Sequence, residues 1–156
     1  MIRRLIVGLF AALLVSGIAG GVGAQKPAGV IDTIDAEWSG VQTDLLEVRR
    51  MSDNTIRVRW RWRNTGDKEV SLYAHDAGDL LKTETYLLDP ANKKKLFVVT
   101  DAKGQPIGTD VGNSFRVKPK ESYAAWAKFP APPANVEKIT VVIAKTPPFE
   151  DVAIGK

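Results

Sequence analysis

The chain has 156 residues, and its 44% hydrophobic and 26% charged residues are typical of a globular domain and not of a disordered one. It contains no cysteine, which excludes disulfides, thiol catalysis, cysteine-based metal sites and lipid attachment through cysteine. The formal net charge is +4 at pH 7.

Residues 1–24 are predicted to be a cleavable signal peptide. Arg3 and Arg4 precede a mostly apolar run over residues 5–18, and small residues lead up to Ala24. The run is short for a bilayer span and glycines follow it, so cleavage after Ala24 is favoured over a membrane anchor. This prediction places the mature chain in the periplasm or outside the cell, with no membrane span after cleavage.

The mature chain, 25–156, is predicted to form one domain. Residues 25–40 are a lead-in segment, which is either a linker or a loosely attached first strand at 30–34. Residues 41–156 form the domain itself. Cleavage removes two arginines and lowers the net charge to +2, so the basic character of the precursor does not indicate nucleic-acid binding.

The stretch 55–64 alternates strictly between apolar residues and arginine. Ile56, Val58, Trp60 and Trp62 share one parity, and arginines occupy the other. Alternation with period two is the pattern of a half-buried β-strand. We therefore expect both tryptophans to lie in a core.

Other segments also predict strands, and short turn signals separate them. The turn at 51–54 joins strands 41–50 and 55–64 into a hairpin, in which Leu46 and Val48 are expected to point inward. The proline-rich stretch 129–134 is expected to cross between two sheets. The further predicted strands are 69–73, 82–88, 96–99 (mostly buried), 115–117, 122–129, 136–144 and 149–154 (an edge strand). Eight or nine short strands without helical periodicity indicate an antiparallel β-sandwich.

Several of these segments resemble one known family. They are residues 64–72, 86–94, 101–106, 126–133 and 147–152, with turn motifs such as Asn64-Thr65-Gly66-Asp67-Lys68. Taken together, their order resembles that of exported bacterial immunoglobulin-like domains, whose relatives include a secreted mycobacterial antigen and domains fused to outer-membrane-protein-A-type modules. The resemblance implies an immunoglobulin-like sandwich outside the cytoplasm. It implies no catalytic residues, and peptidoglycan binding does not transfer because the fused module is missing from this chain.

The strongest candidate site is the arginine row, formed by Arg57, Arg59, Arg61 and Arg63. On the outward face of a strand these four guanidinium groups lie about 7 Å apart and repel one another. One hypothesis is a surface that binds a partner or an anion, since guanidinium suits carboxylate and phosphate. The alternative is an ordinary solvated face on which Glu47, Glu69 or Glu84 neutralises the row.

The loop that holds His75, Asp76 and Asp79 is a weaker candidate. It contains the only histidine, and two carboxylates are too few for a metal site. No nucleophile motif accompanies it, so we predict no catalytic residue, cofactor or metal. Trp38 and Trp126 remain open as either core residues or an aromatic platform for sugar. Lys93, Lys94 and Lys95 are expected to protect a strand edge from aggregation.

These observations favour a non-enzymatic interaction or accessory module of the cell envelope. Its partner would be another envelope protein or an anionic envelope polymer bound by the arginine row, and not nucleic acid. A second hypothesis is a secreted inhibitor of a proteinase or lysozyme that inserts loop 74–81 or 129–134 into the enzyme. The sequence does not specify the oligomeric state.

Overall fold

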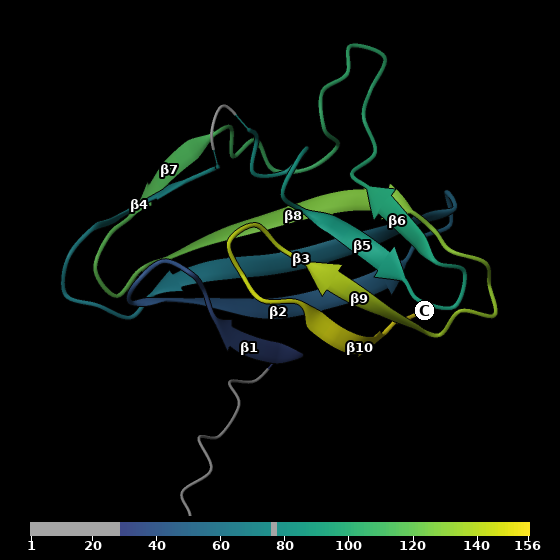
Figure 1. Cartoon of the computed structure of the whole chain (residues 1–156), viewed down its shortest axis with the longest axis horizontal. Coiled ribbons are helices and arrows are strands. Elements are labelled where there is room, and N and C mark those ends of the chain that lie inside the picture. The colour runs from purple at the N-terminus through teal and green to yellow at the C-terminus, as the bar shows by residue number, and fades with distance from the viewer. Residues whose placement is uncertain (1–28, 76–77) are drawn as a thin grey trace, which may run out of the picture.

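The computed structural model describes residues 29–75 and 78–156, and this part of the chain is all-β with antiparallel strand pairing within its sheets (Figure 1). The all-β prediction is confirmed, although ten strands are seen where eight or nine were expected. No helix in the described ranges is long and apolar enough to cross a membrane. The strands are β1 (Asp32–Asp35), β2 (Val41–Arg50), β3 (Thr55–Asn64), β4 (Val70–Tyr73), β5 (Tyr86–Asp89), β6 (Lys94–Phe97), β7 (Ser114–Val117), β8 (Ser122–Pro130), β9 (Lys138–Val142) and β10 (Phe149–Ala153).

The strands form two four-stranded sheets and one small one. Sheet 1 has the order β1-β2-β3-β8, sheet 2 has the order β10-β9-β5-β6, and the small sheet pairs β4 with β7. Figure 1 shows sheet 2 lying across sheet 1. Residues 131–137 connect β8 of sheet 1 to β9 of sheet 2, so the predicted crossover is present. It begins later than predicted, because Phe129 and Pro130 are the last residues of β8.

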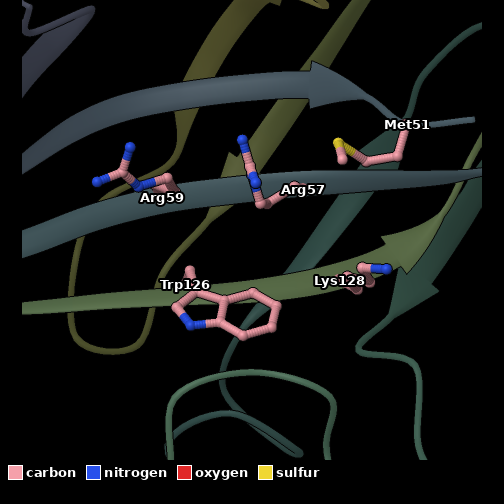
Figure 2. Close-up of a pocket in the computed structure, with 5 residues that line it drawn as sticks. All are labelled: Met51, Arg57, Arg59, Trp126 and Lys128. Carbon is pink, nitrogen blue, oxygen red and sulfur yellow. The ribbon is translucent and has the colours of Figure 1, made fainter.

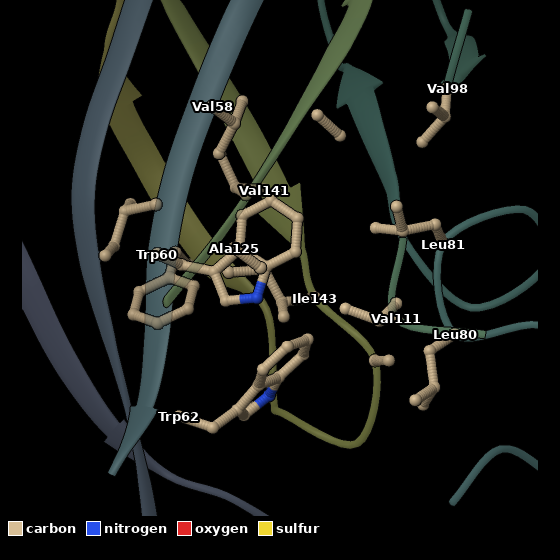
Figure 3. Close-up of a cluster of buried hydrophobic side chains, with 14 of the residues drawn as sticks. Val58, Trp60, Trp62, Leu80, Leu81, Val98, Val111, Ala125, Val141 and Ile143 are labelled. Carbon is tan, nitrogen blue, oxygen red and sulfur yellow. The ribbon is translucent and has the colours of Figure 1, made fainter. Parts of the chain in front are cut away.

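The core lies between the two larger sheets, as in a β-sandwich. Trp60 and Trp62 of β3 are both 0% exposed, and their ring centroids are 5.5 Å apart at an interplanar angle of 89°. Figure 3 shows them among apolar side chains that include Val141 and Ile143. Burying a large aromatic side chain contributes roughly 4–6 kcal/mol before entropy is counted. Neither indole N–H has an acceptor in the described ranges, which offsets about 1–3 kcal/mol of this at each tryptophan.

The prediction that Leu46 points inward is wrong, because β2 contains a bulge. Leu45 lies opposite Trp60 and Glu47 lies opposite Arg59, so Leu46 is an extra residue between two register positions. A bulge shifts the side-chain alternation by one residue. Leu45 is therefore fully buried and Leu46 partly exposed, while Val48 is buried as expected.

The strand predicted over 96–99 is displaced and less buried than expected. β6 begins at Lys94, directly after a turn in which the Asp89 carboxylate accepts hydrogen bonds from Asn92. β6 is an edge strand of sheet 2 that pairs with β5. Leu96 packs partly against the core, while Lys94 and Lys95 are exposed and Phe97 is 50% exposed. Val98 is buried but lies beyond the strand.

The alternative of a first strand in the lead-in segment is confirmed. β1 pairs with β2 in antiparallel register, with Asp32 opposite Leu45 and Asp35 opposite Gln42. Residues 36–38 also contact the body of the domain, since the Glu37 amide donates to the Lys145 carbonyl. The β-structured unit therefore begins well before Val41.

Candidate functional site

The arginine row lies on the outward face of sheet 1, as the alternation of β3 predicts. The inward residues of β3 are buried, while each arginine is partly or fully exposed. β3 is a central strand, so the row is flanked by β2 on one side and by β8 on the other. The outward residues of these two neighbours decide how much positive charge remains free.

Asp44 of β2 neutralises one end of the row. Its carboxylate is 0% exposed and accepts hydrogen bonds from Arg61 Nε at 2.7 Å, from Arg63 at 3.1 and 3.2 Å, and from the Thr33 hydroxyl at 2.7 Å. Burial raises the pKa of this carboxyl, but the hydrogen bonds from Arg63, Thr33 and Arg61 outweigh burial and hold it below its usual value. Asp44 was not predicted as a partner of the row. The available signal was the pair of polar residues, Gln42 and Asp44, that alternate with other residues in the first half of the predicted strand 41–50.

Glu47 neutralises the other end, as the sequence analysis anticipated. Arg57 donates two hydrogen bonds to the Glu47 carboxylate, one from Nε at 2.7 Å and one from Nη2 at 3.3 Å. These hydrogen bonds lower the pKa of Glu47 and raise that of Arg57. The other two expected partners do not reach the row: Glu69 pairs with Arg116 at 3.8 Å, and Glu84 accepts from the backbone amide of His75.

Arg59 is different from the other three arginines. It is exposed, and within the described ranges its guanidinium group forms no ion pair or hydrogen bond. Its neighbours across the strands are Glu47, already held by Arg57, and Trp126 of β8. Its charge therefore remains available to a partner.

A hollow of about 410 Å³ lies beside Arg59 on this face. Met51, Arg57, Arg59, Trp126 and Lys128 line it. Figure 2 shows Arg57 and Arg59 on β3, Trp126 and Lys128 on the neighbouring β8, and Met51 just past the end of β2. Lys128 is tied to Asp53 at 2.6 Å, and this hydrogen bond lowers the pKa of Asp53. The hollow thus combines an indole, a thioether and an unpaired guanidinium group, which are frequent anchors in protein interfaces. We name it the Arg59–Trp126 hollow.

The outward position of Trp126 resolves one open question of the sequence. Tyr123 and Phe129 belong to the inward parity of β8, and Trp126 belongs to the outward one. Trp38 instead packs on Trp62, with ring centroids 6.5 Å apart. The two tryptophans do not form one platform.

The histidine loop holds His75 and Asp79 in separate local contacts among its described residues. His75 is 72% exposed, and its Nε2 lies 4.0 Å from a Glu37 carboxylate oxygen. Asp79 accepts hydrogen bonds from the amides of Leu81 and Lys82 at 2.8 and 2.9 Å, so it stabilises the turn before β5. This turn takes the place of the first half of the strand predicted at 82–88. Asp76 lies outside the described residues.

The two segments suggested for an inhibitor are anchored to the domain by buried residues among those that the structure describes. In 74–81, Leu80 and Leu81 are 0% exposed. In 129–134, Phe129 and Pro132 are buried, and Arg50 donates to the Pro132 carbonyl at 2.7 Å. Both segments are packed against the domain at these residues.

Within 29–75 and 78–156, no group of three or more acidic or histidine side chains could hold a metal ion. The strongest candidate is therefore the Arg59–Trp126 hollow, whose chemistry is that of binding. Comparison with known proteins returns no match among protein-family models, curated proteins or solved structures.

Proposed function

We propose that this chain is an exported, non-enzymatic, immunoglobulin-like binding domain of the bacterial cell envelope, and that it receives a protein partner at the Arg59–Trp126 hollow. Its export rests on the predicted signal peptide over residues 1–24, which lie outside the described residues. Its immunoglobulin-like character rests on the resemblance of the turn motifs and is supported by two antiparallel four-stranded sheets around one core.

The observation that carries the binding proposal is the unpaired Arg59 beside Trp126. Every other arginine of the row has an acidic partner, so the face offers one strong anion-binding group and not a continuous basic stripe. Arg57 and Arg49 add positive charge near Glu47, and both lower the pKa of its carboxyl. A complementary partner would place a carboxylate on Arg59 and an apolar side chain against Trp126 and Met51.

Capture from an envelope extract with the purified domain tests this proposal. Arg59→Gln removes the free charge and Trp126→Ala removes the indole, and each should weaken recovery of the same partner about tenfold, the effect of a modest interface hot spot. Arg116→Gln is the matched control, because Arg116 is an exposed arginine on the small sheet, away from the hollow, and its guanidinium group pairs with Glu69 at 3.8 Å. A partner that binds all three variants as well as the original protein does not use the hollow.

The earlier alternatives gain no specific support. Binding of an anionic polymer along the whole row would compete with Asp44 and Glu47 for three arginines. For the inhibitor hypothesis, the suggested segments each contain buried residues, Leu80 and Leu81 in one and Phe129 and Pro132 in the other, as well as exposed ones such as Pro133 and Ala134. Turnover of any substrate that depends on His75 would contradict the non-enzymatic proposal.

A further inference from the structure

A second hollow, of about 350 Å³, lies on the other side of the domain from the arginine row. It opens between the lead-in segment, the turn before β5 and the turn after β9. Its polar wall consists of Glu37, His75, Thr83, Glu84, Lys95 and Lys145, with Tyr86 as its aromatic residue. We name it the Lys145 hollow.

The backbone of Lys145 is held in an uncommon conformation. Its φ is 57°, in the left-handed region where a non-glycine residue costs about 1–2 kcal/mol. The turn is fixed on both sides: the Lys145 carbonyl accepts from the Glu37 amide at 2.7 Å, and the Thr146 hydroxyl bonds the Thr43 hydroxyl at 2.6 Å. The fold thus fixes the backbone from which this side chain extends and the direction of its Cα–Cβ bond.

The side chain of Lys145 is only 6% exposed, yet its ammonium group has no close partner. Its nearest acid is Glu37, at 4.0 Å, which is beyond hydrogen-bond distance, and no other acceptor in the described ranges bonds it. An ammonium group carries three donors and is costly to bury without acceptors. Among the described residues, the hollow therefore contains an ammonium group on a mostly buried stem that bonds no protein acceptor and is left to solvent or to a ligand.

Glu37 is a replaceable counter-ion for this cation. Its side chain is 60% exposed, and one carboxylate oxygen lies 4.0 Å from both Lys145 Nζ and His75 Nε2. The other acid of the wall, Glu84, already accepts from the His75 amide. Lys95 adds a second ammonium group, 3.5 Å from the centroid of the Tyr86 ring.

We propose that the Lys145 hollow binds a carboxylate group, which takes the position of the Glu37 carboxylate between Lys145 and His75. Two ammonium groups disfavour a cationic ligand there. A side-chain-sized acid fits the volume, so the carboxylate belongs either to a small free acid or to an acidic residue of a peptide. Lys145 supplies the charge, and Glu37 turns outward to solvent when the ligand enters.

Titration of the purified protein, followed by amide NMR, tests this proposal. Acetate represents a small free acid, and an N-acetylated, C-amidated Ala-Glu-Ala peptide represents an acidic residue of a protein. Saturable shifts at residues 37, 75 and 145 are expected with at least one probe. Lys145→Met should abolish them, and Lys138→Met, an exposed lysine on β9, should leave them unchanged. Saturation with the peptide alone would assign the carboxylate to a protein partner.

Glu37→Gln tests the proposal more directly than Lys145→Met, because the exposed Glu37 side chain can be changed without disturbing the core. Removing the competing carboxylate should strengthen binding about two- to fivefold, the effect of one partly exposed ion pair. Weaker binding in Glu37→Gln would overturn the proposal, as would equal binding in Lys145→Met. Saturation by inorganic phosphate but by neither carboxylate probe would also overturn it.

Discussion

Asp44 determines how much of the arginine row is free. A single buried carboxylate joins three strands, because it accepts from Thr33 of β1 and from Arg61 and Arg63 of β3. Burying a charge costs several kcal/mol unless its partners are close and well oriented, and here each partner is a direct hydrogen bond. The same contacts that hold the sheet together therefore remove two arginines from any binding surface.

Asp44→Asn should destabilise the protein by about 3 kcal/mol at pH 7, because it removes the charge that two guanidinium groups share. Both arginines are 31% exposed and can turn to water, so the loss stays at the lower end for a broken buried pair. Urea denaturation measures this loss as a decrease in the free energy of unfolding. Glu47→Gln is the matched control, since its pair with Arg57 is more exposed and should cost about 0.2–1 kcal/mol.

The pH dependence of stability tests whether Asp44 is held as a charged carboxylate by its arginine partners. The pKa of Asp44 lies below its ordinary value of 3.8 in the folded protein, so the unfolded chain binds the proton more readily. The stabilisation is fully present above pH 3.8 and is lost as the pH falls through the folded pKa. Denaturation midpoints of Asp44→Asn should therefore fall less steeply below about pH 4 than those of the original protein. Parallel curves for the two proteins would contradict this role.

At the residue scale, the sequence predicted the faces of β3 correctly and the partners of its arginines only in part. Period-two alternation is a local property, so the burial of Trp60 and Trp62 follows from the sequence itself. The pairing of Arg61 with Asp44 depends on the register between β2 and β3, which the bulge at Leu46 shifts. No local pattern specifies that bulge, so Glu47 was identified and Asp44 was not.

At the element scale, the segment 98–110 covers the outer edge of β8. Val99 donates to the Lys128 carbonyl, Lys128 donates to the Ile107 carbonyl, and Thr109 donates to the Trp126 carbonyl, all at 2.8–2.9 Å. An uncovered edge would offer unpaired backbone groups to another chain. The same bonds hold Trp126 in place beside the Arg59–Trp126 hollow.

Gly108→Ala should destabilise this edge by about 1–3 kcal/mol, because an added Cβ would lie 2.5 Å from the Trp126 carbonyl oxygen. Thermal unfolding should show a loss of about 3–5 °C per kcal/mol in a domain of this size. Gly104→Asn is the control: Gly104 has φ of +74° with open space around it, and asparagine tolerates that conformation. Equal melting temperatures for Gly108→Ala and the original protein would show that the segment moves aside.

Hairpins were predicted better than long-range pairs at this scale. The bounds 41–50 and 55–64 match β2 and β3, and Asn54 in the intervening turn has φ of 58°, as its turn chemistry favours. Gly104 likewise has a positive φ, of 74°, which glycine adopts without steric cost in such a loop. The pairing of β4 with β7 in the small sheet was not predicted. About forty residues of chain separate the two strands, and neither sequence indicates which strand is its partner.

At the scale of the whole molecule, the two larger sheets are joined along the edge of β2 that does not pair with β3. β1 pairs with the first half of that edge, up to Leu45. Beyond the bulge, Gly155 pairs with this edge instead. Its amide donates to the Val48 carbonyl, and its carbonyl accepts from the Arg50 amide. Since β10 belongs to sheet 2, the tail that follows it connects sheet 2 to sheet 1.

The same edge shows why the lead-in segment belongs to the folded unit. From the sequence, 25–40 was either a linker or a loose strand, because its pattern is short and interrupted by Pro27, Gly29 and Gly40. In the structure Thr33 bonds Asp44 and Trp38 packs on Trp62. Both contacts are with residues distant in sequence, so local patterns could not decide between the two alternatives.

A chain that begins at Val41 should therefore lose most of its stability. It lacks β1, the Thr33 hydroxyl that supports buried Asp44, and the Glu37 amide that bonds the Lys145 carbonyl. Together these losses amount to several kcal/mol out of the roughly 5–15 kcal/mol by which domains are stable. Urea denaturation of this chain should show a much lower midpoint or no cooperative transition, against a reference chain that begins at Gln25. A midpoint equal to that of the reference would mean that the edge of β2 needs no cover from β1.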